Sequence, residues 1–252
     1  MLLKTKISVV DQENPQEGSA AEAGRVLKNG GIVSFPTETV YALGADAYNA
    51  DTVAKIYRIK RRDRCKPLSV FLRSAEDAQK VVDCASPEAQ MLMEKFWPGP
   101  LTLVFKCTDR RLSLVLAKGE KLGIRVSPSR LVGRLLEEAG VPITATSANI
   151  SGKKSCVAAN RVFYFFNGRI DMILDGGKSK VFLPSTVLDV CTDEVSLIRL
   201  GHIPLDDIRK VVPEIRIPEA DASNCESQDA VEVGTIAPKD STGDEQQPGA
   251  SG

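Results

Sequence analysis

Basic side chains crowd one short stretch of the chain, KIYRIKRRDRCKP from Lys55 to Pro67. It holds seven basic residues, with Asp63 as its single acid. Arginine forks bind phosphate oxygens through paired hydrogen bonds, and a lysine adds a point charge, so the stretch could hold a phosphorylated ligand. A solvated helix end is the alternative, because cations favour the C-terminal end of the helix dipole. The net charge of this stretch would repel itself without a bound anion, which leaves both interpretations open.

A second polar stretch, PITATSANISGKKS from Pro142 to Ser155, follows an apolar strand. It presents hydroxyl and amide groups, then a glycine and two lysines. Ligands of open α/β sheets bind beyond the carboxyl ends of strands, where such loop residues lie. The phosphate-binding pattern GxxxxGK[ST] is absent, so this is no Walker A loop. An ordinary turn rich in Asn, Ser and Gly is the alternative.

Three polar residues, Thr37, Glu38 and Thr39, come directly after the apolar run 32–35 and the rigid Pro36. A loop that only had to turn would favour Gly, Asn or Asp at its tip. Two hydroxyls around a carboxylate are instead groups that could contact a ligand.

Further polar groups occur singly within apolar strands. Arg125 in GIRVSPS and Arg199 in LIRLG each need an anionic partner or dense hydrogen bonding if they are buried. A structural glutamate could supply that partner as well as a ligand could. Thr102 in WPGPLTLVF and the pair Ser185-Thr186 in FLPSTVLDV carry little information alone, because hydroxyls at strand ends often bond locally.

The elements that must position these groups alternate between strand and helix, which indicates one α/β domain around a twisted mixed sheet with helices on its faces. Spacing and capping residues predict helices starting at Ser74 and Ser86 and over residues 18–29, 50–60, 127–139, 157–166 and 204–211. Apolar runs predict strands over residues 32–35, 68–72, 101–106, 123–126, 141–145, 172–174, 186–190 and 195–198. We assign residues 1–17 to an N-terminal extension, 18–212 to the single α/β domain and 213–252 to an acidic tail.

Charge separates the predicted tail from the rest of the chain. Residues 219–252 carry a net charge of −7, which leaves +7 on residues 1–218. The tail has no aromatic residue and too few apolar ones to order itself, so we expect disorder.

Composition excludes several classes of protein. His202 is the only histidine and the six cysteines form no CxxC pair, which argues against a zinc site or a histidine-based triad. No apolar run is long enough for a membrane span, and the N-terminus lacks a secretory signal. A soluble cytoplasmic protein with reduced thiols is expected, and a mitochondrial pool stays open.

Taken in order, seven motifs resemble the YrdC family, the threonylcarbamoyl-AMP synthases. They are PTETVYALGADA, KRRDRCKPL, WPGPLTLVF, GIRVSPS, TSANISGKKS, PSTVLDV and LIRLG. The family hallmark Lys-x-Arg and Ser-x-Asn is matched by Lys60-Arg61-Arg62 and Ser147-Ala148-Asn149. The resemblance runs from about Gly18 to Ile203, and it implies a YrdC-like fold with a large, positively charged concave groove.

The resemblance also implies an activity and its residues. L-threonine, bicarbonate and ATP would give threonylcarbamoyl-AMP and pyrophosphate, and a downstream threonylcarbamoyl transferase complex would use the product to modify tRNA. Lys60 and Arg62 would be catalytic, and we expect both to be exposed at a helix end. The implied ATP site comprises Lys60, Arg62, Lys66, Thr102, Ser147, Asn149, Ser155 and Arg199. The implied threonine site comprises Thr39, Arg125, Ala145, Ser185 and Thr186, with the choice between the last two left open. Mg²⁺ is expected to arrive with ATP, so no protein ligand to a metal is assigned.

Some positions depart from the family pattern. YALG replaces Tyr-Gly-Leu-Gly, RRDRC replaces a Gly-Arg-Pro-type run, and RVS and RLG lack the proline that often follows. The second domain of the longer family branch is expected to be missing, because only the acidic tail follows.

Two alternatives remain from the sequence. A non-catalytic module could bind double-stranded RNA or tRNA through its basic groove. Aromatic residues that could stack on bases are few, at 5%, and do not cluster in the basic loop, which argues mildly against this. The other is an enzyme of hydrogenase maturation acting on another carbamoyl donor, but the acylphosphatase and zinc-finger modules of such proteins are not visible.

Overall fold

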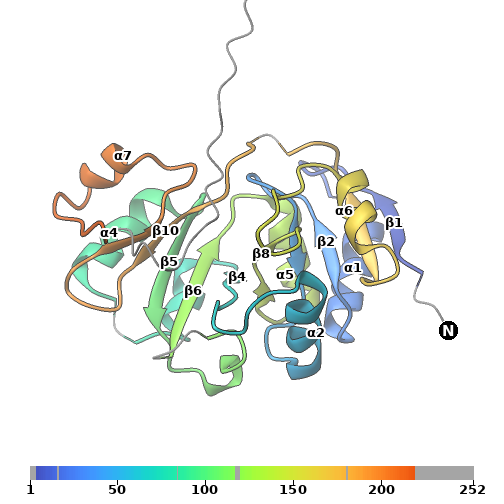
Figure 1. Ribbon diagram of the computed structural model, residues 1–252, viewed down its shortest axis with the longest axis horizontal. Helices are drawn as coiled ribbons and strands as arrows, with labels where there is room; N and C mark the ends of the chain where they lie inside the picture. Colours follow the sequence, from blue (N-terminus) through green and yellow to red (C-terminus); the bar gives the residue numbers. More distant parts are fainter. Residues whose placement is uncertain (1–3, 16, 84, 117–119, 180, 219–252) are drawn as a thin grey trace, which may run out of the picture. The chain divides into compact units, whose positions relative to one another are not determined.

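The strands form two mixed sheets with helices beside them (Figure 1). The computed structural model describes residues 4–15, 17–83, 85–116, 120–179 and 181–218. The first sheet has the order β1 (Lys6–Val9), β9 (Met172–Asp175), β2 (Val33–Phe35), β3 (Ala42–Gly44) and β8 (Thr146–Ser147). The second has the order β11 (Ser196–Arg199), β10 (Thr186–Asp189), β5 (Leu101–Lys106), β6 (Lys121–Val126), β4 (Val70–Leu72) and β7 (Ile143–Thr144). The predicted α/β class with mixed pairing is confirmed, and the strands divide between two sheets where the sequence predicted one.

The segment 143–147 passes from one sheet to the other. Its first part, β7, pairs antiparallel with β4, and its second part, β8, pairs antiparallel with β3. Between them the Ala145 amide donates to the Ser69 carbonyl at 2.6 Å, and the Thr144 amide donates to the Ala45 carbonyl at 2.9 Å. The predicted strand 141–145 is therefore two short strands with different neighbours. This change of sheet brings Ser147 and Asn149 beside the first sheet.

Most helices occur where capping and spacing predicted them. They are α1 (Glu17–Lys28), α2 (Ala50–Lys60), α3 (Ala75–Gln79), α4 (Pro87–Phe96), α5 (Arg130–Ala139), α6 (Ala159–Phe166) and α7 (Leu205–Arg209), with a short 3₁₀ helix at Arg110–Leu112. The Ser74 and Ser86 hydroxyls cap α3 and α4 as predicted. Gly30, at a φ of 78°, follows α1, where glycine adopts the left-handed conformation without strain. In the described part of the chain, no helix has the length and apolar character that crossing a membrane requires.

Helix α5 begins later than predicted, at Arg130 instead of Ser127, with the Ser129 side chain as its cap. The reason lies in the bonds of Ser127. Its hydroxyl accepts a hydrogen bond from the Ser129 amide at 3.2 Å and donates one to Glu38 at 2.7 Å. Ser127 therefore stays outside the helix and faces the loop between β2 and β3.

Apolar side chains of α1 and α5 pack against the first sheet. Leu27 of α1, Phe35 of β2 and Leu135 of α5 are all fully buried within one core cluster. Burial of a side chain of this size contributes about 1.5–3 kcal/mol. A larger second cluster includes Ile56 of α2 and Leu103 of β5. These cores fix the ends of α2, β5 and β6, which carry the polar residues singled out above.

Residues assigned from the sequence to the two terminal segments take part in the sheets. Residues 6–9, placed in the N-terminal extension, form β1 and pair in parallel with β9. Near the other end, the Leu197 amide donates to the Arg216 carbonyl at 2.8 Å, so part of the segment 213–218 runs beside β11. The predicted disorder of residues 219–252 lies outside the described residues.

Candidate functional site

Lys60, the last residue of α2, is buried instead of exposed. Its side chain passes inward, and the residue keeps only 1% of its surface accessible. The ammonium group donates to the Ser147 carbonyl, to the Asn149 carbonyl at 2.9 Å and to Asn149 Oδ1 at 3.1 Å. Three donors thus meet three acceptors. Burial, and next the charge of Arg62, lowers the pKa of Lys60 to about 7.

The loop after β8 folds around this ammonium group. Ser147 Oγ donates to Asn149 Oδ1 at 2.6 Å, and the side-chain nitrogen Nδ2 of Asn149 donates to the Lys153 carbonyl. The Ser151 amide donates to the carbonyl of Lys60 itself at 2.8 Å. The two halves of the Lys-x-Arg and Ser-x-Asn hallmark therefore form one connected unit.

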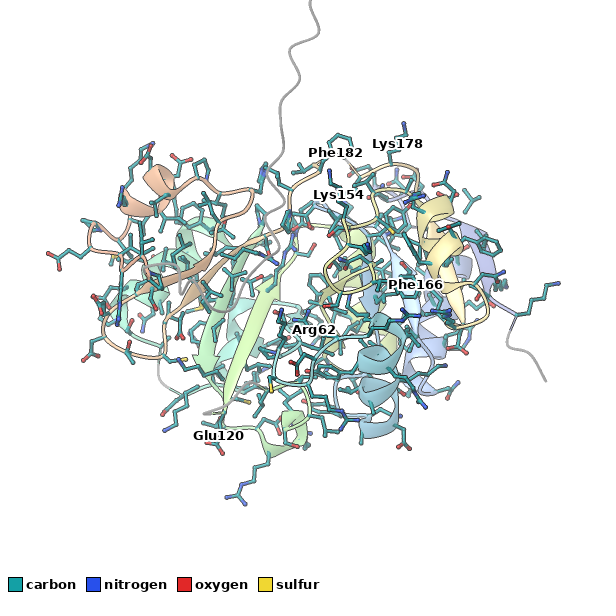
Figure 2. All side chains as sticks on the ribbon, viewed as in Figure 1. Arg62, Glu120, Lys154, Phe166, Lys178 and Phe182 are labelled. Carbon is teal, nitrogen blue, oxygen red and sulfur yellow. The ribbon has the colours of Figure 1, made fainter. Side chains whose placement is uncertain are left out.

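Arg62 lies just after α2, where the chain reverses (Figure 2). Arg61 before it adopts a left-handed conformation, with a φ of 51°, and ends the helix. Arg62 Nε donates to the Lys66 carbonyl at 3.2 Å and Nη2 to the Pro67 carbonyl at 2.8 Å. These neutral acceptors hold the side chain without cancelling its charge, and burial lowers its pKa. The guanidinium is therefore fixed in place and uncompensated by any acid in the described residues.

A second group forms where the loop between β2 and β3 meets β6. Arg125 Nη2 donates to Glu38 Oε1 at 2.5 Å and to Thr39 Oγ1 at 3.1 Å. The other carboxylate oxygen of Glu38 accepts from Ser127 Oγ at 2.7 Å. Arg125 Nε reaches the Gly99 carbonyl at 3.4 Å. A buried arginine required an anionic partner, and Glu38 from the other sheet supplies it.

A third group joins β5, β10 and β11. Thr102 Oγ1 and Ser185 Oγ share a hydrogen bond of 2.9 Å, and Arg199 Nη2 donates to the Ser185 carbonyl at 2.9 Å. Thr186, by contrast, donates to the Ile203 carbonyl at 2.8 Å, and its oxygen accepts from two backbone amides. Of the pair left open by the sequence, Ser185 faces the arginine and Thr186 holds the chain at residues 201–203.

The arginine of the third group interacts electrostatically with those of the other two. Arg199 is exposed as a whole residue, but partial burial of its guanidinium lowers its pKa, and the positive charges of Arg125 and Arg62 lower it further. Positive charges from the residue after the α2 cap, from β6 and from β11 thus act on one another at Arg199, and Glu38 is bonded only to Arg125. Such a concentration of positive charge suits a polyanionic ligand.

Three other predicted site residues contribute no side-chain hydrogen bond to these groups in the described part of the chain. Lys66 is exposed, and Ala145 and Ser155 are half-buried. The Lys66 carbonyl accepts from Arg62, and within the described ranges no side-chain hydrogen bond connects Ala145 or Ser155 to the groups around Lys60, Arg125 or Arg199. The described residues also contain no cluster of three or more His, Cys, Asp or Glu that could hold a metal ion. Sequence reasoning named Glu38 only as one of three neighbouring groups that could contact a ligand, and it gave no role to Ser127.

Comparison with known proteins identifies relatives along most of the chain. A family model described as Telomere recombination, which groups Sua5, YciO and YrdC, matches residues 25–201. A protein of Bacillus subtilis named threonylcarbamoyl-AMP synthase is 38% identical over 219 residues, covering 85% of this chain and 63% of that protein. One of the same name from Pyrococcus abyssi is 37% identical over 209 residues, covering 83% of this chain and 62% of that protein. The chain thus spans less than two thirds of the length of both relatives.

Solved structures resemble this fold. The crystal structure of P. abyssi Sua5 complexed with L-threonine has a TM-score of 0.79 and 37% identity, covering 85% of this chain and 63% of that one. Escherichia coli YciO has a TM-score of 0.75 and covers 81% of this chain and 99% of that one, but at 23% identity it shows the fold alone. From the matched residues and the identity to these relatives, the chain belongs to the Sua5/YciO/YrdC family.

Proposed function

We propose that this chain is a threonylcarbamoyl-AMP synthase, a nucleotidyltransferase that converts L-threonine, bicarbonate and ATP to threonylcarbamoyl-AMP and pyrophosphate. One observation carries the proposal. Among the described residues no acid pairs with the guanidinium groups of Arg62 and Arg199, and their charges interact with each other and with that of Arg125, which Glu38 balances. A triphosphate and a neutral zwitterionic amino acid fit such a pair of neighbouring environments. The relatives named as synthases support the same reaction.

The nucleotide is held by the uncompensated part of the site. Arg62 contacts phosphate oxygens, since a fork held by two carbonyls is already oriented for bidentate binding. Lys60 is enclosed by its three acceptors, so it fixes the conformation of the loop 147–149 and adds positive charge on the inner side of that loop. Thr102, Ser147, Asn149, Ser155, Lys66 and Arg199 complete the proposed ATP site.

The amino acid is held beside Arg125 and Thr39, with Ala145 and Ser185 at its edge. The threonine nitrogen, once its ammonium group has lost a proton to water, attacks bicarbonate to give N-carboxythreonine and water. A carboxylate oxygen of this intermediate attacks the α-phosphorus, the bond to the bridging oxygen breaks, and pyrophosphate leaves with that electron pair. No protein nucleophile is required. Arg62 and Arg199 stabilise the negative charge that develops on the phosphates.

Magnesium fits this site only as a companion of ATP. Both oxygens of Glu38, the one acid described in the site, are already bonded to Arg125 and Ser127. Mg²⁺ is therefore carried on phosphate oxygens and water, and it neutralises phosphate charge when bound. We further propose that a threonylcarbamoyl transferase complex takes the product to tRNA in the cytoplasm. The RNA-binding alternative is not favoured, because no specific observation supports it.

Omission of single substrates tests the proposal. AMP-containing product and pyrophosphate should form from ATP only when threonine and bicarbonate are both present. Serine or glycine in place of threonine should lower turnover. Undiminished turnover without bicarbonate, or with glycine, would contradict the proposed reaction.

A further inference from the structure

We propose that Glu38 is a positioning residue that reserves Arg125 for the carboxylate of the amino acid and keeps it from binding phosphate. The inference rests on the proposed function and deepens it. It explains why two anionic groups, a carboxylate and a triphosphate, would bind to different members of a set of neighbouring arginines.

Hydrogen bonding at Arg125 uses two of the three guanidinium nitrogens within the described residues. Nε is directed to the Gly99 carbonyl, and Nη2 is shared between Glu38 and Thr39. Nη1, with two N–H groups, makes no hydrogen bond within the described residues. The guanidinium also lies over the Phe71 ring, 5.7 Å from its centroid, which restricts its tilt. Arg125 is thus held in one orientation, with a single arm left for a ligand.

The hydroxyl chain behind Arg125 fixes Thr39 as an acceptor. Thr37 Oγ1 donates its only proton to the Val40 carbonyl at 2.7 Å. The 2.9 Å bond between Thr37 and Thr39 must therefore use the proton of Thr39. With its proton engaged, Thr39 can only accept from Nη2 of Arg125, as observed. Thr39 is buried, with 1% of its surface accessible, so it acts on the ligand through Arg125.

The charge of Glu38 separates the two ligand environments. Its carboxylate is bonded at both oxygens, to Arg125 on one side and Ser127 on the other. Arg125 and Glu38 together are neutral, whereas Arg62 and Arg199 are not paired with an acid in the part of the chain that the structure describes. A triphosphate is drawn to the unpaired arginines, and a net-neutral amino acid is accepted beside the paired one. Loss of Glu38 would turn Arg125 into a third unpaired cation.

The test uses Glu38→Gln, which keeps the size of the side chain and removes its charge. Calorimetric titration should show L-threonine binding weakened by about 10- to 100-fold, the cost of a misplaced contact. Inorganic pyrophosphate should instead bind more tightly, by roughly 3- to 10-fold, because one more cation is free. Opposite changes for the two ligands are the signature, since a general disturbance of the fold would weaken both.

Two further variants make the result decisive. Ser127→Ala removes the second contact of Glu38 and should shift both affinities in the same directions by a smaller factor. Added to Glu38→Gln it should change nothing more, because Ser127 acts through Glu38. Asp189→Asn breaks the 2.5 Å ion pair between Asp189 of β10 and Lys121 of β6, the strand that carries Arg125, and should leave both affinities unchanged.

Each outcome decides between the hypotheses. Equal weakening of threonine and pyrophosphate in Glu38→Gln, or unchanged threonine binding, overturns the role of Glu38. If Glu38→Gln does not fold, the same comparison on Ser127→Ala decides. Failure of the proposed function is seen separately, because the wild-type chain would then form no pyrophosphate in response to threonine.

Discussion

The ammonium group of Lys60 combines near-complete burial with three carbonyl acceptors. Replacement by methionine keeps the volume of the side chain and leaves the Asn149 carbonyl without a donor, whereas the Ser147 carbonyl and Asn149 Oδ1 keep the Asn149 backbone amide and the Ser147 hydroxyl. An unsatisfied buried acceptor costs about 1–3 kcal/mol, so Lys60→Met should lower the free energy of unfolding by about that amount. Urea denaturation measures this change. The exposed Lys66→Met, by comparison, should change it by less than about 0.5 kcal/mol.

Protonation of Lys60 couples its pKa to pH and to ligand binding. The pKa of about 7 in the fold lies below its ordinary value of 10.5. Between these pH values the unfolded chain binds more protons, so this group makes the fold more stable as pH rises through that window. At pH 8 the free protein carries Lys60 mostly as the neutral amine. Because the positive charge of Arg62 lowers this pKa, a polyanion bound at Arg62 should raise it.

ATP binding at pH 8 should therefore take up a proton. Titration calorimetry in two buffers of different ionisation enthalpy measures the uptake, which should approach one proton per ATP and disappear near pH 6. Lys60→Met should abolish it. A wild-type chain that binds ATP at pH 8 with no uptake contradicts this coupling.

Variants at Arg62 separate the contribution of the shape of its guanidinium group to turnover from that of its charge. Arg62→Lys keeps the charge but loses the fork, and turnover should fall by roughly 10²–10³, the range for a preorganised donor. Arg61 is the matched control, because it is adjacent and exposed. Arg61→Asn removes a charge and suits the left-handed backbone at that position, so turnover should stay near normal. Equal losses in both variants would point to diffuse charge instead of a contact.

The residues of the site were only partly predictable from the sequence. The motif residues around Lys60, Arg125 and Arg199 do gather, and their types indicated anion binding. Burial of Lys60 was not predictable, because two of its three acceptors are the backbone carbonyls of residues 147 and 149, and every residue type has such a carbonyl. The pairing of Glu38 with Arg125 depends on two sheets meeting, and local sequence does not encode that meeting.

At the scale of elements, close packing of α1 on α5 gives a sharp contrast between two glycines. A Cβ on Gly24 of α1 would lie 2.2 Å from Glu138 Cβ of α5, whereas a Cβ on Gly133 of α5 would meet nothing within 4 Å. Gly24→Ala should destabilise the fold by about 1–3 kcal/mol through overpacking. Gly133→Ala should stabilise it by about 0.5–1 kcal/mol through helix propensity. Thermal unfolding of the two variants checks both signs.

Elements with strong local signals were predicted well. Helix α2 and strand β5 have the predicted bounds, since each has clear periodicity or a long apolar run between turn residues. Strands β1 and β3 were missed. Lys6–Val9 has a polar start, Ala42–Gly44 is only three residues long, and both are strands because of their partners. Elements defined by pairing over a long distance carry little local signal.

At the scale of the whole molecule, β9 holds the first sheet together, because it pairs with both β1 and β2. A chain ending at Arg169 would lack this strand, although it would contain all of α1, β2 and β3. Such a chain should be cleaved rapidly by a protease under conditions in which the full chain resists. Comparable resistance of the two chains would show that the first sheet closes without β9.

The order of the strands along the chain determines when the sheets and the candidate site can form during synthesis. Lys6 of β1 cannot pair with β9 until Met172 has been synthesised. Lys60 and Arg199 of the candidate site lie 139 residues apart along the chain. At about 5–20 residues per second, a ribosome needs roughly 7–28 s to pass from the first of these site residues to the second. During that interval α2 and the arginines that follow it have been made, but the strands β10 and β11, which complete the candidate site, have not. The emerging chain is therefore a basic, unfinished surface on the ribosome, and it is exposed to surrounding RNA before it can close.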